Sequence, residues 1–318
     1  MKKAMLVPPS LNKTRSPIKR LAMQYIKNYD LFLLFLPVIV YYVVFAYIPM
    51  YGVVLAFKKF QLLGGIMGSP WVGFDNFKEI FSTGSFYEVL RNTINISLLR
   101  LIFGFPAPII LALLLNEITN KWFKKIIQTV SYLPHFLSWI VLTGIFIQFL
   151  SPTSGPINFL ITAMGFKSIY FLGQPNWFIF TLISTGIWQG IGWGSIIYLA
   201  AISNIDQEMY ESAELEGVSR FQRIIYITLP SIMPTVTILL ILNVGGILNA
   251  GFDQIFNLYN DAVLNVADII DTYVYRRGLN GMQYSYATAV GLFKNVIGFV
   301  LVLGTNAITK RMSEYALW

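Results

Sequence analysis

The residues most able to do chemistry form one polar, acidic stretch between two apolar ones. The stretch runs Tyr210-Glu211-Ser212-Ala213-Glu214-Leu215-Glu216-Gly217 and ends at Ile227-Thr228-Leu229-Pro230. Lipid solvates neither its charges nor its free backbone groups, so the stretch must leave the bilayer. The pattern predicts a short helix, a turn at Gly217, where glycine tolerates a positive φ, and a second short helix that Pro230 ends. Ser212 and Ala213 are small enough for a partner to approach closely. We therefore expect a surface on which a partner protein docks, the alternative being an ordinary acidic connection.

Catalysis and cofactor binding are not expected of this chain. The sequence contains no nucleophile–base pair and no G-x-x-x-x-G-K-[ST] phosphate loop, so any ATP must be hydrolysed by another subunit. It has no cysteine and one histidine, His135, which excludes thiolate and multi-histidine metal sites. We expect His135 to be a structural side chain near the inner end of a helix. The net charge of +8 favours a basic cytoplasmic face over a nucleic-acid partner.

The composition is that of a membrane protein. Of the 318 residues, 56% are hydrophobic and 12% are charged, and the mean hydropathy is +0.62. Soluble domains carry about 25% charged residues. Runs of about 20 apolar residues predict an all-α protein with six transmembrane helices. They lie at residues 31–57, 93–115, 127–150, 178–202, 232–252 and 287–308.

Lysines and arginines predict the orientation of these helices. Fourteen of them fall in residues 1–30, 116–126, the acidic loop and the C-terminal tail, against six in the long, folded connections expected on the other side. The richer side should face the cytoplasm, with both termini. Residues 1–30 alternate basic and apolar residues and are expected to form an amphipathic tail on anionic lipid. Residues 31–318 form the transmembrane domain, with the acidic loop at about 203–231.

The acidic loop resembles a signature of the permease subunits of binding-protein-dependent ABC importers. That pattern is E-A-A, three residues, G, nine residues, I, one residue and L-P. It is met here by Glu211, Ser212, Ala213, Gly217, Ile227, Leu229 and Pro230, with Ser212 as the one departure. The resemblance implies a type I permease fold and a second permease subunit in a bacterial plasma membrane. It also implies two copies of a cytoplasmic ABC ATPase, which bind ATP and Mg²⁺, and an extracellular solute-binding lipoprotein.

Further stretches resemble the permeases for complex sugars of Gram-positive bacteria, at residues 47–52, 132–139, 187–190, 251–254 and 289–294. This resemblance implies a carbohydrate substrate, an oligosaccharide of the pectin-derived or otherwise acidic kind. It also implies substrate contacts from the two helices beside the acidic loop, through aromatic rings and amide groups. The candidates on those two helices are Trp188, Gln189, Gly190, Trp193, Asn243, Gly246 and Asn249. Lys294 of the last predicted helix is a further candidate, because an acidic sugar would suit a basic cavity. The same tryptophans and glycines also fit helix packing or membrane interfaces.

Other functions fit parts of the sequence. An ABC permease for another solute, such as peptides or amino acids, would share the acidic loop. An ion-coupled secondary transporter would need a relay of ionisable residues at membrane depth and repeated halves, whereas the chain offers Lys294 and no repeat. A lone charge at that depth costs at least ~2.5 kcal/mol. Lys294 should therefore face a cavity, a second subunit or a carboxylate, with Asp253 as a possible partner.

Overall fold

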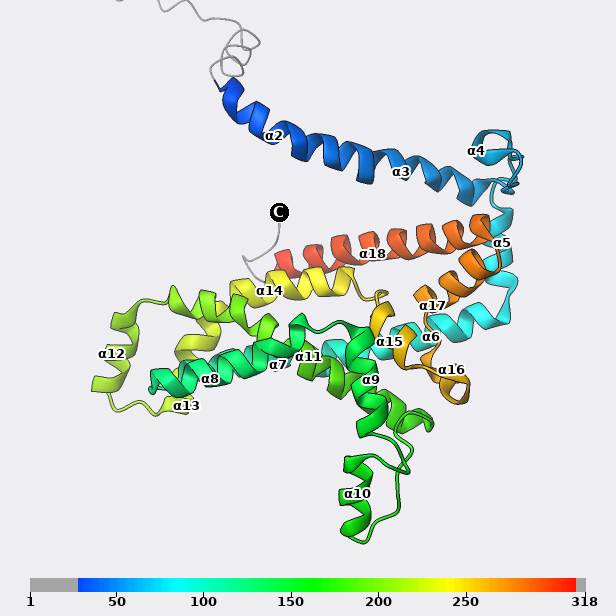
Figure 1. Ribbon diagram of the computed structural model, residues 1–318. Helices are drawn as coiled ribbons and strands as arrows, with labels where there is room; N and C mark the ends of the chain where they lie inside the picture. The colour runs from blue at the N-terminus through cyan, green and yellow to red at the C-terminus, as the bar shows by residue number, and fades with distance from the viewer. Residues whose placement is uncertain (1–27, 313–318) are drawn as a thin grey trace, which may run out of the picture. The chain divides into compact units, whose positions relative to one another are not determined.

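The structure is a computed structural model that describes residues 28–312, and within that range it is all-helical (Figure 1), with two isolated β-bridges in place of any sheet. The chain divides into two units, residues 1–54 and 55–318, and each is treated separately below. Residues 1–27 lie outside the described range, and with them nearly all of the amphipathic tail expected for residues 1–30.

The first unit is an apolar helix that is exposed along its described length. It comprises α2 (Tyr29–Tyr42), the π-helical turn η1 (Val43–Tyr47) and α3 (Ile48–Met50), none of which contains a buried residue. The 3₁₀ turn η2 (Tyr51–Phe57) leads out of it. Residues 29–57 together are long and apolar enough to cross a membrane, in agreement with the first predicted span.

The second unit holds the remaining helices. In chain order they are α4 (Gly65–Gly68), α5 (Asp75–Ser82), α6 (Gly84–Leu99), η3 (Arg100–Gly104), α7 (Pro106–Asn116), α8 (Lys121–Tyr132), η4 (Leu133–Phe136), α9 (Trp139–Phe149), α10 (Pro156–Ala163), α11 (Pro175–Ser203), α12 (Gln207–Leu215), α13 (Arg220–Arg223), η5 (Ile224–Thr228), α14 (Leu229–Gly245), α15 (Phe252–Leu258), η6 (Asp261–Val263), α16 (Leu264–Ala267), α17 (Ile270–Val274), η7 (Tyr275–Asn280) and α18 (Tyr284–Met312).

Four helices in the described range are long and apolar enough to span a membrane. Besides the first unit, they are α6 to α7, α13 to α14, and α18, and the bent pair α8–α9 makes a fifth if it counts as one span. Helix α11 has 29 residues, which is long enough, but its glycines and polar residues make it less apolar than the four. A helix surrounded by protein needs less apolar surface than one that faces lipid.

Helix α11 lies at the centre of the second unit. Its Phe178 and Leu182 belong to one buried cluster with residues of α6, α15 and α16. Its Tyr198 and Ile202 belong to another, with residues of α7 and α14. Figure 1 shows α7 alongside α11, and α14 alongside α18. Residues of α6, α11 and α14 are therefore held at fixed positions relative to one another.

Three of the long helices pass through a π-helical turn that ends two residues before a proline. Turn η1 precedes Pro49 of α3, turn η3 precedes Pro106 of α7, and turn η5 precedes Pro230 of α14. The wider turn makes room for the proline ring, which would otherwise clash with a carbonyl of the preceding turn, so all three helices continue. The prediction that Pro230 ends a short helix is therefore wrong, because residues 220–245 form one helix.

The third predicted span, residues 127–150, is not one helix. Helix α8 ends at Tyr132, the 3₁₀ turn η4 contains Pro134, and α9 then leaves at an angle of 104°. Leu137 and Ser138 are extended, and the Ser138 hydroxyl accepts the Val141 N–H at 3.5 Å to begin α9. Sequence hydropathy missed this break because apolar residues continue from the end of α8 into α9 and the extended link is two residues long.

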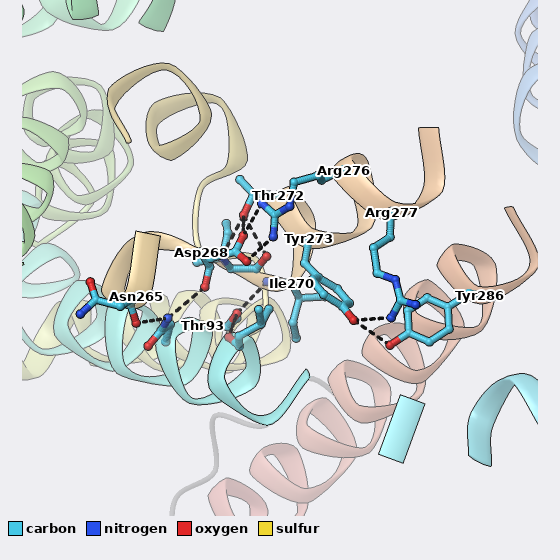
Figure 2. A network of polar contacts seen from close by, with 12 residues as sticks. Thr93, Asn265, Asp268, Ile270, Thr272, Tyr273, Arg276, Arg277 and Tyr286 are labelled. Carbon is cyan, nitrogen blue, oxygen red and sulfur yellow. Dashed lines mark hydrogen bonds and ion pairs between the residues drawn. The ribbon is translucent and has the colours of Figure 1, made fainter. Parts of the chain in front are cut away.

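The connection between α15 and α18 is folded, as expected for the long connections, and is fixed to α6. Figure 2 shows its centre at Asp268, whose carboxylate accepts from Thr272 at 2.8 Å and from Arg276 at 2.5 Å. The hydrogen bonds from Arg276 to Asp268 raise the pKa of the Arg276 guanidinium. The Thr93 hydroxyl of α6 accepts the Ile270 N–H at 2.9 Å.

A second polar contact joins α17 to α18 (Figure 2). Arg277 donates to the Tyr273 hydroxyl at 2.7 Å, and its guanidinium lies 4.1 Å from the centre of the Tyr286 ring. The two tyrosine hydroxyls are 3.0 Å apart and buried. These contacts give the connection a defined surface.

Candidate functional site

The acidic loop folds as two helices around a left-handed turn. Asp206 caps α12 by accepting the Glu208 N–H at 3.0 Å. After Leu215 the chain turns at Gly217, whose φ is +73°, and the Val218 N–H returns to the Ala213 carbonyl at 3.0 Å. This is the usual glycine C-cap of a helix. The turn was predicted from the sequence, and it places Glu211 and Ser212 on the exposed side of α12 while Ala213 is buried.

The second arm of the loop starts with a capping box. The Ser219 hydroxyl accepts the Gln222 N–H at 3.4 Å, and the Gln222 side chain accepts the Ser219 N–H at 3.0 Å. Ile227, Leu229 and Pro230 follow, in or directly after η5, within the same helix that continues as α14. Movement of the loop would therefore move α14 directly.

Sequence reasoning missed the residue that braces this loop. Arg223 makes a close ion pair with Glu214 of α12, and it lies 3.8 Å from the Glu117 carboxylate that follows α7. Its side chain is 14% exposed, so the ion pairs are shielded from water on one side. The Tyr210 and Thr228 hydroxyls add a contact of 2.9 Å across the two arms. The loop is thus fixed both internally and to the end of α7.

A cavity of about 590 Å³ lies between the helices that this loop connects. Its walls come from α6 and η3, from the middle of α11, and from the end of α14 with the link to α15. Polar side chains on those walls are Ser97, Arg100, Gln189, Tyr198, Asn243, Asn249, Asp253 and Gln254. A cavity with several amide and hydroxyl groups and apolar walls suits a polyhydroxylated ligand.

Five of the eight predicted substrate residues line this cavity. They are Gln189, Gly190, Asn243, Gly246 and Asn249. Asn249 was expected on a helix that faces α11, but it lies in the link after α14 ends. That helix stops early because Gly246 to Asn249 form tight turns and Gly251 adopts a φ of +87°.

The predicted tryptophans do not line the cavity. Trp193 stacks on His135, with ring centres 4.7 Å apart and planes 3° from parallel. Trp188 meets Phe146 of α9 edge to face at 5.8 Å. Both are about half exposed in this single chain. Trp139, at the start of α9, lines the cavity instead, because the break after η4 turns that helix end inward.

Lys294 is also absent from the cavity wall. It pairs with Asp271 of α17 at 2.5 Å, and its side chain is 13% exposed. The suggested partner Asp253 is therefore wrong. Asp271 was overlooked because it lies 23 positions earlier, in a connection that the sequence does not place against α18.

Two glycines of α11 have different surroundings. A Cβ on Gly192 would overlap the Ser131 carbonyl of α8, so this glycine allows the two helices to pack closely. Gly190 has nothing within 4 Å of its Cβ position and faces the cavity.

Comparisons with known proteins agree with this architecture. Residues 104–314 match the family described as "Binding-protein-dependent transport system inner membrane component". The chain is 45% identical to protein LplB of Bacillus subtilis over 91% of both chains. It is 42% identical to the polygalacturonan/rhamnogalacturonan transport system permease protein YteP of the same organism, over 94% of both.

The fold also has a solved counterpart. A chain in the crystal structure of a bacterial alginate ABC transporter, bound to a periplasmic protein that carries an alginate pentasaccharide, superposes with a TM-score of 0.86. That match is 41% identical and covers 94% of this chain and 100% of the other.

Proposed function

Since this chain belongs to the family of inner membrane components of binding-protein-dependent transport systems, we propose that it forms half of the pore of an ABC importer for oligosaccharides. It is the permease of a carbohydrate importer in the plasma membrane and performs no catalysis itself. Relatives named as a polygalacturonan/rhamnogalacturonan permease and as part of an alginate transporter support a carbohydrate.

One observation carries the proposal. The polar cavity is lined by α11 and by the end of α14, and the acidic loop is the segment that joins these two helices. A force on the loop therefore reaches both walls of the cavity along continuous helices. We assign ATPase docking to Glu211, Ser212, Ala213, Gly217, Ile227, Leu229 and Pro230. We assign the sugar path to Gln189, Gly190, Asn243, Gly246 and Asn249. Trp188 and Trp193 instead pack against other rings, and Lys294 forms an ion pair with Asp271.

The proposed transporter contains this permease, two ATPase subunits, a second permease and an extracellular binding protein. Two copies of a cytoplasmic ABC ATPase bind ATP and Mg²⁺ and close the docking loops. A second permease completes the path, because one chain of this size encloses too little of it. An extracellular binding lipoprotein delivers the sugar. In this arrangement α11 and the α8–α9 pair count as spans, so that six helices cross the membrane and both termini lie in the cytoplasm.

Uptake into proteoliposomes tests the proposed function. We expect the complete complex to accumulate labelled oligosaccharide only with ATP on the ATPase side and the loaded binding protein on the other. A protonophore and a sodium ionophore should leave uptake unchanged, because no ion gradient is used. Uptake without ATP, or its loss on adding an ionophore, would favour an ion-coupled transporter instead.

A further inference from the structure

Arg100 is a partly buried cation in the wall of the cavity, and its charge has no counterion in the described residues. It lies midway along the 33-residue helix 84–116. Its guanidinium donates to the Gln254 side-chain oxygen at 2.5 Å, while its Nε is buried without a partner. None of the ion pairs found in residues 28–312 includes Arg100. A charge at this depth is costly unless it is paired.

The surrounding residues hold the guanidinium at the cavity wall. The Gln254 amide donates to the Leu182 carbonyl at 2.8 Å and to the Thr185 hydroxyl at 2.9 Å, which turns its oxygen toward Arg100. A Cβ on Gly251 would overlap the guanidinium, so the left-handed glycine makes room for it. Arg100 is also the first residue of the π-helical turn η3, and such turns are common at functional sites.

A second polar atom on the same helix face lacks a partner. The Ser97 hydroxyl, three residues before Arg100, is buried and unpaired, and it lines the same cavity. The other charged side chain of the wall is Asp253, which is exposed and forms no ion pair with Arg100 in the described structure. The wall therefore offers guanidinium and hydroxyl donors side by side, without a carboxylate of its own at that point.

We infer that Arg100, oriented by Gln254, binds a carboxylate group of the transported sugar. This inference rests on the proposed function and narrows its substrate to oligosaccharides that contain uronic acid residues. Guanidinium groups bind carboxylates through charge-assisted, paired hydrogen bonds that neutral sugars lack. The anion supplies the missing counterion only while the sugar occupies the cavity.

Two matched sugars test the site in the reconstituted complex. One is trigalacturonate, and the other is the same trisaccharide with its carboxyl groups reduced to hydroxymethyl groups. We expect Arg100→Gln to lower uptake of trigalacturonate at least tenfold and uptake of the neutral sugar less than twofold. The same binding protein serves every variant, so a change in the ratio of the two rates belongs to the permease. Arg100→Lys keeps the charge and should keep most of the preference for the acidic sugar.

Two further variants separate the inference from its rivals. Arg91→Gln removes an exposed arginine from the same helix outside the cavity and should change neither rate. Asp253→Asn should maintain or raise trigalacturonate uptake. Three results would overturn the inference. Arg100→Gln could lower the uptake of both sugars equally, or Asp253→Asn could lower trigalacturonate uptake as much as Arg100→Gln does. The third is failure of both Arg100 variants to assemble. If the wild-type complex took up neither sugar, the proposed function itself would be rejected.

Discussion

Replacing Gly217 with valine is expected to abolish sugar uptake while the permease still reaches the membrane. Gly217 has a φ of +73°, which a β-branched residue tolerates poorly, at a cost of ~1–3 kcal/mol. The cost is relieved if the turn opens, and the opened turn no longer holds α12 against η5. Uptake by the reconstituted complex should fall at least tenfold, with co-purification of the ATPase reduced in parallel.

Gly165 provides a matched control for this variant. It has a φ of +86° with nothing within 4 Å of its Cβ position, and it lies after α10, far along the chain from the acidic loop. Gly165→Val carries the same backbone strain and should leave ATPase binding intact. Gly217→Asn should retain part of the uptake, because asparagine adopts positive φ more readily. Normal uptake with Gly217→Val would rule out the docking assignment.

Replacing Gly190 with leucine is expected to block the sugar path without disturbing assembly. The Cβ position of Gly190 is unobstructed and faces the cavity, so a leucine there occupies space that the sugar needs. We expect uptake to fall at least tenfold. ATPase co-purification and the melting temperature of the complex should stay near the wild-type values.

Gly192, two residues further along α11, should respond in the opposite way. Its Cβ would meet the Ser131 carbonyl, and over-packing of this kind costs ~1–3 kcal/mol or more. Gly192→Leu should therefore lower protein level and thermal stability. Gly144→Leu, at an exposed position of α9 outside the cavity wall, should change neither property. If Gly190→Leu transports normally, the cavity is not the sugar path.

The sequence predicted the acidic loop well because its determinants are local. Spacing alone identified the turn at Gly217. Glu211 and Ser212 are exposed on α12 as a docking surface requires, whereas Ala213 is buried. The prediction for Pro230 was wrong because the sequence around a proline is similar whether the proline ends a helix or follows a π-helical turn. That distinction depends on how the preceding turn packs, which a single sequence does not reveal.

The cavity was predicted only in part, for a similar reason. Gln189 and Asn243, which were chosen from their positions along the predicted helices, line the cavity, since both lie on regular helices beside the loop. Trp139 was missed because its orientation depends on the break after η4. Arg100 was not among the predicted substrate residues, because its orientation depends on Gln254, which is 154 positions away.

A cysteine placed at Ser212 offers the most direct test of the docking loop, because the chain has no cysteine of its own. Ser212 is exposed on α12 in this chain. In intact cells, a membrane-impermeant maleimide should leave Ser212→Cys unlabelled and should label Ser168→Cys. In inside-out vesicles, Ser212→Cys should be protected while the ATPase subunits are bound and should react once they are stripped. Labelling of Ser212→Cys from outside the cell, or equal labelling with and without the ATPase, would contradict the account.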